Sequence, residues 1–446
     1  MQERSLLKEF AHYVTSNVFG MIGLSCYILA DTFFVANGLG ADGLAALNLA
    51  IPIYSFVHGS GLMFGMGGAT RYSIARGQND LPKGNRIFST TVYMMGALAF
   101  LFVLCGLFLS GKITEMLGAD QAVFDMTRTY LQVILLFAPA FMANDTLLCF
   151  VRNDGSPALA MTGMLAGSFS NIILDYVFIF PCGMGIFGAV LATGLAPVIS
   201  LLILSVHWLK KRNQFHLVRV RPVLSLCTGI LSLGFPSLIT EMASGIVIIV
   251  FNMIILGLQG NVGVAAFGVV ANLSLVVISI YTGIAQGIQP IVSKLYGRGD
   301  KAGQKQILKY ALLSMLVVSV SIYLLFLLGA GPIVSLFNSE HNARLQTIAT
   351  QGLKLYFTAI PFVGFNIILS ACFAASEKAL PAQIISLSRG FVLIIPLAFL
   401  MAALWKMTGV WLSFPAAEGL VALLGLALYA RTEKEAAGKL CRQPRR

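Results

Sequence analysis

The sequence predicts an all-α polytopic membrane protein with twelve transmembrane helices in two six-helix lobes, related by a pseudo-two-fold axis along the membrane normal. Three observations support this fold class. Of the 446 residues, 57% are hydrophobic and only 11% are charged, which is more apolar than a soluble globular protein tolerates. The apolar residues form runs long enough to cross a bilayer. The second half of the chain also repeats features of the first.

A spanning helix needs about 20 predominantly apolar residues. Cutting the chain at its polar and Gly/Pro-rich breaks leaves twelve such runs, namely residues 10–36, 45–75, 87–110, 127–151, 158–181, 186–209, 227–256, 263–295, 307–330, 345–374, 382–404 and 408–430. The first run is longer than the apolar core of a signal peptide, and no convincing cleavage site follows it. We therefore expect it to remain as the first transmembrane helix.

The basic residues are concentrated in alternate loops. Of the 30 Lys and Arg residues, 24 lie on the side of the two termini, 5 lie on the opposite side, and Arg389 lies inside a predicted helix. Because cytoplasmic loops keep their positive charges during insertion, we expect both termini to be cytoplasmic. This distribution also explains the net charge of +12 without a nucleic-acid partner.

An internal repeat relates the two halves of the chain. Residues 45–80 align without gaps on residues 265–300, a shift of 220. The matching residues Ala45, Ala46, Gly67, Ser73, Gly77 and Asp80 recur as Ala265, Ala266, Gly287, Ser293, Gly297 and Asp300. Further along, Cys149-Phe150 recurs as Cys372-Phe373. Two echoes at a nearly constant shift indicate that the halves share one fold.

An even number of helices in each half gives both halves the same orientation in the membrane. Parallel repeats of this kind build transporters whose halves rock about a central site. We predict an N-lobe at 1–209, a cytoplasmic linker at 210–226, a C-lobe at 227–431 and a basic tail at 432–446. The small-residue pairs Gly61/Gly65, Gly163/Gly167 and Gly283/Gly287 are expected to let helices pack closely.

Enzyme and ATPase motifs are absent from the sequence. Gly38 to Gly43 match GxGxxG, but this stretch joins two membrane helices and follows no strand, so we expect no dinucleotide site. There is no Walker A sequence, and the seven cysteines contain no CxxC pair. The histidines, which fit no HExxH pattern, are His12, His58, His207, His216 and His341. We expect neither an enzyme nor a cofactor, disulfide framework or metal cluster.

Placing an ionisable residue inside a membrane span costs free energy, so such residues are candidates for function. They are Asp31, Asp145, Asp175, Glu241, Glu418 and Arg389. Asp145 is expected to pair with Arg152, two turns away. Glu241 could attract a cationic substrate, act as a second protonation site or pair with Arg389, and the role of Glu418 is undecided.

Four polar residues are placed to form one site. At about 1.5 Å rise per residue, Asp31, Asp175 and Thr193 each fall roughly 9 Å below the outer surface, and Asn171 lies one turn deeper on the face of Asp175. If the first, fifth and sixth helices are neighbours, two carboxylates, an amide and a hydroxyl converge. Oxygen ligands suit a hard cation such as Na⁺. The pair could instead hold a proton, because burial and a neighbouring like charge favour a protonated carboxyl.

Two other interpretations bear on these residues. Each of the four could be satisfied by an interhelical hydrogen bond, a common feature of membrane bundles. In the second half, Arg389 aligns near Asn171 and Leu393 near Asp175. Since the carboxylate is missing there, we expect a cation site in the N-terminal half alone.

Several motifs resemble those of one family, the multidrug and toxic compound extrusion (MATE) transporters. They are "ILADTFFVANGLGADGLAALNLAIP", "GMGGATRYSIARGQND", "FVRNDGSPALAM", "NIILDYVFIF" with "GIFGAVLATGLA", and "GVWLSFPAAEGL". The resemblance implies two six-helix lobes and antiport of drugs against Na⁺ or H⁺. It also implies coupling residues at Asp31, Asn171, Asp175 and Thr193, as in prokaryotic branches with an N-lobe site. Other branches rely on an acidic residue in the seventh helix, where this chain has Glu241.

These observations predict a secondary active multidrug efflux transporter. We expect it to export lipophilic, cationic drug-like compounds by antiport with Na⁺ or H⁺, through alternating access, as a monomer surrounded by lipid in the cell membrane. The alternative within the superfamily is a flippase for a lipid or lipid-linked sugar, which would have a more cationic central cavity.

Overall fold

The computed structural model describes residues 2–338 and 342–442, and for residues 2–4, 41 and 436–442 it describes the backbone alone. The charged side chains of the predicted tail at Lys439, Arg442, Arg445 and Arg446 lie outside this description. Within the described ranges the chain is helical and has no strand. The α-helices are α1 (Gln2–Gly77), α2 (Leu81–Phe108), α3 (Ser110–Met116), α4 (Phe124–Leu136), α5 (Ala138–Asn153), α6 (Pro157–Ile179), α7 (Gly185–Leu204), α8 (Val206–Leu209), α9 (Leu224–Gly297), α10 (Lys301–Phe337), α11 (Ala343–Tyr356), α12 (Ile360–Ala375), α13 (Ala379–Leu387) and α14 (Ile394–Arg442). A 3₁₀ turn, η1 (Phe357–Ala359), and a π-helical segment, η2 (Ser388–Val392), complete the elements.

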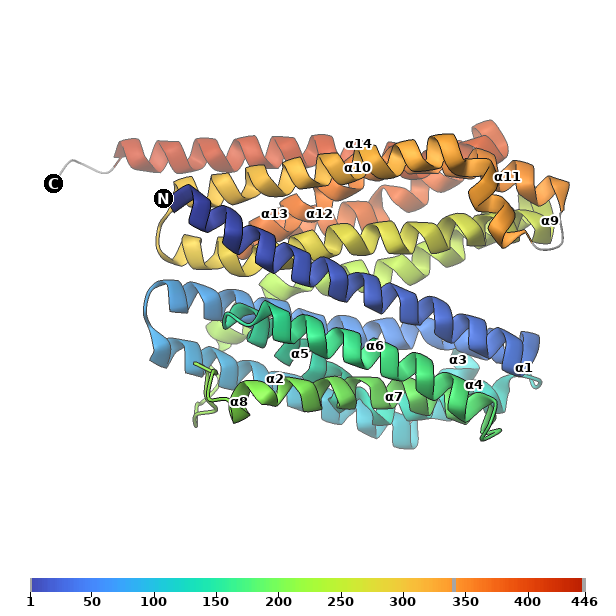
Figure 1. The fold of residues 1–446 in the computed structure, drawn as a ribbon, viewed down its shortest axis with the longest axis horizontal. Helices are drawn as coiled ribbons and strands as arrows, with labels where there is room; N and C mark the ends of the chain where they lie inside the picture. Colours follow the sequence, from blue (N-terminus) through green and yellow to red (C-terminus); the bar gives the residue numbers. More distant parts are fainter. Residues whose placement is uncertain (1, 339–341, 443–446) are drawn as a thin grey trace.

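The helices form two bundles that lie side by side (Figure 1). The N-lobe contains α1 to α8, and the C-lobe contains α9 to α14. Both parts of α1, before and after its kink, pack against α9 along the contact between the lobes. The chain begins at the same end of the molecule at which α14 ends (Figure 1), and we call this the terminal end.

The described helices make twelve spans once their kinks are considered. Nine stretches are long and apolar enough to cross a membrane, and the bent pair α4 and α5, at 49° to each other, makes a tenth. Two of these stretches are divided again, at Gly260 in α9 and at Trp405 and Lys406 in α14. The predicted fold class of twelve helices in two lobes is therefore confirmed. The short helices α3 and α8 were not predicted.

The internal repeat is visible in the turns and kinks. Gly40 in α1 and Gly260 in α9, which are 220 residues apart, kink their helices at φ values of 68° and 64°, a conformation that favours glycine. Asp80 accepts a hydrogen bond from the Lys83 backbone amide at 3.0 Å. Its counterpart Asp300 accepts one from Gly303 at 2.8 Å. Both aspartates are therefore N-caps.

The lobes meet in a symmetric glycine contact. A Cβ atom on Gly77 would lie 2.4 Å from the Lys294 carbonyl oxygen, and one on Gly297 would lie 2.3 Å from the Ile74 carbonyl oxygen. Because 74 and 77 correspond to 294 and 297 in the repeat, the same contact is made twice. This is the geometry expected at a pseudo-two-fold axis, with the backbones of α1 and α9 in direct contact.

Further glycines extend this contact along both helices. A Cβ on Gly67 would lie 1.9 Å from the Ile230 carbonyl oxygen, and one on Gly234 would lie 1.8 Å from that of Met63. In the other half of the interface, Gly283 and Gly287 lie against the backbone of α1 at Val18 and Val14. The predicted close packing at Gly283/Gly287 is therefore found between the lobes.

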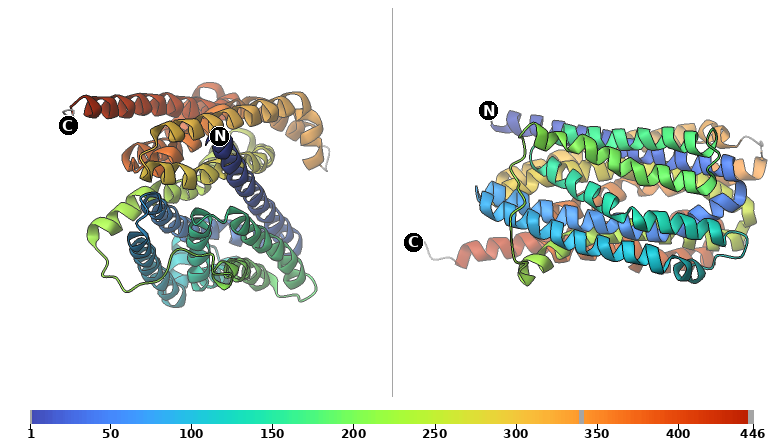
Figure 2. Two further views of the ribbon diagram at one scale, coloured as in Figure 1. Left: turned by 60° about the vertical axis from the view of Figure 1, so that its left-hand side comes forward. Right: turned by 90° about the horizontal axis from the view of Figure 1, so that it is seen from below.

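The linker after α8 is held on the N-lobe. It is extended and crosses the terminal end of that lobe (Figure 2). Asp154 accepts hydrogen bonds from the Gln214 backbone amide at 2.8 Å, from Tyr72 at 2.6 Å and from His207 at 2.8 Å. Phe215, which is fully buried, is inserted among the lobe's aromatic side chains.

Glycine substitutions should test the inter-lobe contact. Gly234→Ala places a methyl group onto the Met63 backbone, so we expect it to force the lobes apart and to lower the free energy of unfolding by about 1–3 kcal/mol. Gly96→Ala is the matched control, because a Cβ there has nothing within 4 Å and alanine favours a helix. Thermal unfolding of the detergent-purified protein measures both. Equal stability of the two variants would contradict this account of the interface.

Candidate cation site

Asn171 and Asp175 are buried on one face of α6, as their spacing requires. The Asn171 amide, in the orientation that satisfies both of its ends, donates to Asp175 Oδ2 at 3.0 Å and accepts from the Thr193 backbone amide at 3.2 Å. The Thr193 hydroxyl donates to the Ala189 carbonyl at 3.1 Å, which leaves its oxygen lone pairs available. The helices α6 and α7 therefore bring three of the four predicted residues together.

Asp31 joins this group from α1. It is 8% exposed, and its carboxyl group lies within hydrogen-bonding reach of Asp175. The Oδ1 atoms of Asp31 and Asp175 are buried and have no hydrogen-bond partner among the described residues. The structure thus places all four residues in one cluster, with two carboxylate oxygens left unsatisfied.

This cluster can bind a small hard cation or a proton. Its side chains offer carboxylate, amide and hydroxyl oxygens, the donors that such cations prefer. Neither Asp31 nor Asp175 forms an ion pair with a described basic side chain. An ion or a proton is therefore the charge partner that the geometry accommodates.

Glycines allow the helices of the site to approach each other. Gly163 and Gly167 of α6 lie against Ser200 and Ala196 of α7, and a Cβ on Gly167 would be 3.1 Å from the Ala196 carbonyl oxygen. A Cβ on Gly38 of α1 would lie 2.3 Å from the Ile179 side chain of α6. The predicted role of the Gly163/Gly167 pair in close packing is confirmed.

A second polar chain runs from α1 toward the lobe contact. The hydroxyls of Tyr27 and Tyr54 are 2.8 Å apart, and the Tyr54 ring stacks on His58 with an interplanar angle of 6°. His58 Nδ1 lies 2.8 Å from Asp145 Oδ2. Since Tyr27 is one turn before Asp31, this chain begins beside the cation site.

The predicted pairing of Asp145 with Arg152 is wrong. Asp145 faces α1, where a Cβ on Gly61 would lie 2.7 Å from its Oδ2 atom, so the absence of a side chain at Gly61 lets Asp145 reach His58. Arg152 is instead buried at the terminal end of α5. It donates to Asn17 and, across the lobe contact, to Gln286, both at 2.7 Å.

Glu241 lies between the lobes and not with the four site residues. A Cβ on Gly59 of α1 would be 3.1 Å from the Glu241 Cβ. Because Gly59 directly follows His58 in the chain, Glu241 lies close to the His58 position. Its charge is near those of His58 and Asp145. It does not pair with Arg389, so that alternative is excluded.

Arg389 pairs with Glu418 inside the C-lobe. Its Nε and Nη2 atoms donate to Glu418 Oε1 at 3.1 and 2.9 Å, and the Asn366 amide donates to Glu418 Oε2 at 2.7 Å. Arg389 lies in the π-helical segment η2, and such segments are frequent where a side chain has a special position. The role of Glu418, which the sequence left undecided, is therefore that of an ion-pair partner: its charge is neutralised by the guanidinium of Arg389.

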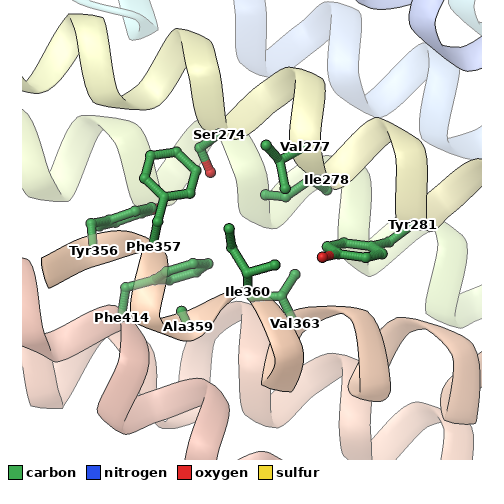
Figure 3. A pocket seen from close by; sticks show the side chains of 10 residues that line it. All are labelled: Ser274, Val277, Ile278, Tyr281, Tyr356, Phe357, Ala359, Ile360, Val363 and Phe414. Carbon is green, nitrogen blue, oxygen red and sulfur yellow. The ribbon is translucent and has the colours of Figure 1, made fainter. Parts of the chain in front are cut away.

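The rest of the C-lobe interior near this level is apolar and filled. Figure 3 shows Tyr356, Phe357 and Phe414 among the side chains that line a small pocket here. Its volume is about 10 Å³, about that of a single water probe. The rings of Tyr356 and Phe414 stack with centroids 4.4 Å apart.

Sequence reasoning missed His58, Tyr54 and Tyr27 as parts of a connected polar chain. The histidines were treated as isolated because they are far apart in the sequence. Tyr54 and His58 are four residues apart on one helical face, which was the available signal. Nothing in the sequence alone showed that Asp145 would face them.

Two pseudo-symmetric six-helix lobes with a polar site buried inside one of them define a membrane transporter built from parallel repeats. The family model described as MatE matches residues 17–177 and 236–400. Because this match covers more than half of the chain, the protein belongs to the MATE family of transporters.

Individual relatives cover nearly the whole chain. The multidrug export protein MepA of Staphylococcus saprophyticus is 28% identical over 430 residues, which is 96% of this chain and 94% of the relative. MepA of Staphylococcus aureus strain MRSA252 is 26% identical, with the same coverage. Among solved structures, the outward-facing conformation of a multidrug resistance MATE family transporter has a TM-score of 0.89 at 22% identity, covering 97% of this chain and 96% of that one. A Vibrio cholerae MATE transporter also has a TM-score of 0.89, at 20% identity, covering 97% of this chain and 98% of that one.

Breaking the C-lobe ion pair should destabilise the protein. Glu418→Gln leaves the Arg389 guanidinium buried without a countercharge, so we expect a loss of about 3–5 kcal/mol in unfolding free energy. Arg431→Gln removes one partner of the exposed pair with Glu435 and should cost less than about 1 kcal/mol. Thermal unfolding in detergent compares the two. If the double variant Arg389→Met/Glu418→Met is less stable than Glu418→Gln, an unpaired charge is not the cause.

Proposed function

We propose that the protein is a secondary active efflux transporter that exports lipophilic cationic compounds in exchange for Na⁺ or H⁺. The observation that carries this proposal is the facing pair of buried carboxyl groups at Asp31 and Asp175, which forms no ion pair with a basic side chain in the described part of the chain. The names of the relatives, as multidrug export proteins, support the direction of transport. We place the protein in the cell membrane as a monomer with both termini in the cytoplasm, because the basic loops lie on that side.

The two carboxylates should repel each other when the site is empty. At an effective dielectric constant of about 20, two like charges about 4 Å apart repel by roughly 4 kcal/mol. This exceeds the 1–3 kcal/mol that typically couples two sites in a protein. A cation or proton that removes the repulsion therefore favours the arrangement in which α1 stays packed on α6.

The helix α1 can carry this change to the other lobe. Asp31 is on the same helix as Ser25, whose hydroxyl is 2.5 Å from that of Ser279 in α9. A shift of α1 relative to α6 would therefore disturb the contact between the lobes. The lobes touch at the terminal end through Gly77 and Gly297, so we infer that this conformation is closed toward the cytoplasm.

Substrate and coupling ion would then favour opposite arrangements. Each binds one state better than the other, so that binding of one promotes release of its competitor. Glu241, at the lobe contact, is placed to attract a cationic substrate. The flippase alternative has less support, because Arg389 is neutralised by Glu418 and Arg152 is already engaged by Asn17 and Gln286.

Removing one charge of the carboxyl pair should uncouple transport from the ion gradient. In proteoliposomes with an imposed Na⁺ or pH gradient, we expect Asp175→Asn to lower ion-driven export of a cationic dye at least tenfold, because the ion no longer distinguishes the two states. The control is Asp125→Asn, whose side chain is exposed on α4. Comparison of the two gradients in the unmodified protein identifies the ion. Full ion-driven export by Asp175→Asn would sink the proposal.

Glu241 should affect the substrate and not the coupling ion. We expect Glu241→Gln to raise the half-saturating concentration of a cationic dye about tenfold, since an attraction to a charged ligand is lost, and to leave export of a neutral dye unchanged. Glu115→Gln, on the exposed helix α3, is the control. An altered Na⁺ or pH dependence in Glu241→Gln would instead assign Glu241 to coupling.

A further inference from the structure

The C-lobe contains a cavity of about 1350 Å³ at the terminal end of the bundle. It is lined by residues of α9, α10, α12, α13 and α14 and of the loop between α12 and α13. Its walls include the apolar side chains of Leu308, Phe373 and Leu428, and its rim includes Lys301, Lys305 and Lys378. Neither the coupling site nor the contact between the lobes uses these residues.

The equivalent position in the N-lobe is filled by the chain itself. Phe215 of the linker packs on Phe88, Phe150 and Trp208, with ring centroids 4.5, 5.6 and 5.4 Å away. In the internal repeat, Phe88 and Phe150 correspond to Leu308 and Phe373 of the cavity wall. The cavity is therefore the C-lobe counterpart of the Phe215 site. It lacks that occupant because α14 continues as a helix to Arg442, whereas the N-lobe chain turns back after Leu209.

The polar groups at the mouth also differ between the two lobes. In the N-lobe, Asn85 and Ser89 accept hydrogen bonds from the linker amides of His216 and Val218, both at 2.8 Å. Their counterparts in α10 are Lys305 and Lys309. Neutral acceptors for a peptide are thus replaced by cations, which suit an anionic group.

Two lysines at the rim have no countercharge among the described residues. The rim carboxylates are each engaged elsewhere: Glu377 with Arg71, Glu433 with Lys305, and Glu435 with Arg431. Lys301 and Lys378 form no such pair in the described chain. Lys378 Nζ lies 6.0 Å from the centre of the Phe373 ring in the cavity wall. Burial lowers the pKa of Lys378; the charges of Glu433 and Glu435 oppose this effect, and those of Lys301 and Lys305 add to it.

The combination of apolar walls and an unpaired cationic rim selects an amphiphilic anion. The chain's own residues 436–446 carry only basic charges, at Lys439, Arg442, Arg445 and Arg446, so they do not complement the rim. Free phosphate would leave the walls unfilled. Basic pockets between transmembrane helices at a membrane surface are known to bind lipid head groups.

We propose that this cavity binds one anionic phospholipid from the leaflet at the terminal end, with its phosphate at Lys301 and Lys378 and an acyl chain against Leu308, Phe373 and Leu428. The site is distinct from the transport pathway. The lipid takes the place that Phe215 has in the N-lobe and completes the packing of the C-lobe.

Two kinds of variant separate the charge from the apolar wall. Lys301→Gln/Lys378→Gln removes the unpaired charges at the rim. Arg298→Gln/Lys434→Gln is the matched control, because it removes two exposed cations near the same end of the C-lobe that do not line the cavity. Leu428→Trp fills part of the cavity with a bulky ring from α14. If Leu428→Trp fails to fold, the lysine variants still decide the question.

Binding is measured on the full chain in detergent, by native mass spectrometry during titration with phosphatidylglycerol, phosphatidylcholine or inorganic phosphate. We expect one tightly bound phosphatidylglycerol in the unmodified protein, and affinity at least tenfold lower in Lys301→Gln/Lys378→Gln and in Leu428→Trp. The control pair should bind as the unmodified protein does. Equal affinity for phosphatidylcholine, competition by millimolar phosphate alone, or an equal loss in the control pair would overturn the proposal. None of these readouts depends on transport.

Discussion

A carboxylate inside a bilayer persists only where its charge is neutralised, and the two lobes meet this constraint differently. In the C-lobe, Glu418 is held by the guanidinium of Arg389, a cation that cannot leave. In the N-lobe, Asp31 and Asp175 face each other with unsatisfied oxygens, and no basic side chain that the structure describes pairs with them. The same fold therefore contains one carboxylate that its own chain neutralises and one pair that, in the proposed function, an ion or proton from outside neutralises.

The two lobes are symmetric at the contact between them, but their polar interiors differ. The glycines at the pseudo-two-fold axis recur in both halves, because each helix backbone must approach its counterpart and any side chain would prevent it. Away from the axis, the N-lobe buries a pair of carboxyl groups at Asp31 and Asp175, whereas the C-lobe buries Glu418 paired with Arg389. The helix α1 connects these regions, since it contributes Asp31 to the site and Ser25 to the lobe contact.

The sequence was sufficient for features that depend on periodicity along one helix. Run lengths predicted the spans, and the four-residue spacing of Asn171 and Asp175 placed them on one face. Contacts that depend on how a helix is rotated toward its neighbours were not predictable. Asp145 could have faced Arg152 on its own helix, and only the gap at Gly61 of α1 shows why it reaches His58 instead. Likewise, Glu418 pairs with Arg389, which lies in the π-helical segment η2. Composition and spacing do not reveal where such a segment changes the helical register.

The anchoring of the linker limits how far the lobes can separate. Its backbone is bonded to the N-lobe as far as Val218, through Ser89, and α9 begins at Leu224. Only Arg219 to Val223 are free to extend between the two attachment points. At about 3.3–3.6 Å per residue, this tether spans roughly 20 Å when fully stretched. The covalent chain itself therefore sets an upper bound on the opening of the terminal end, whatever the substrate or the ion.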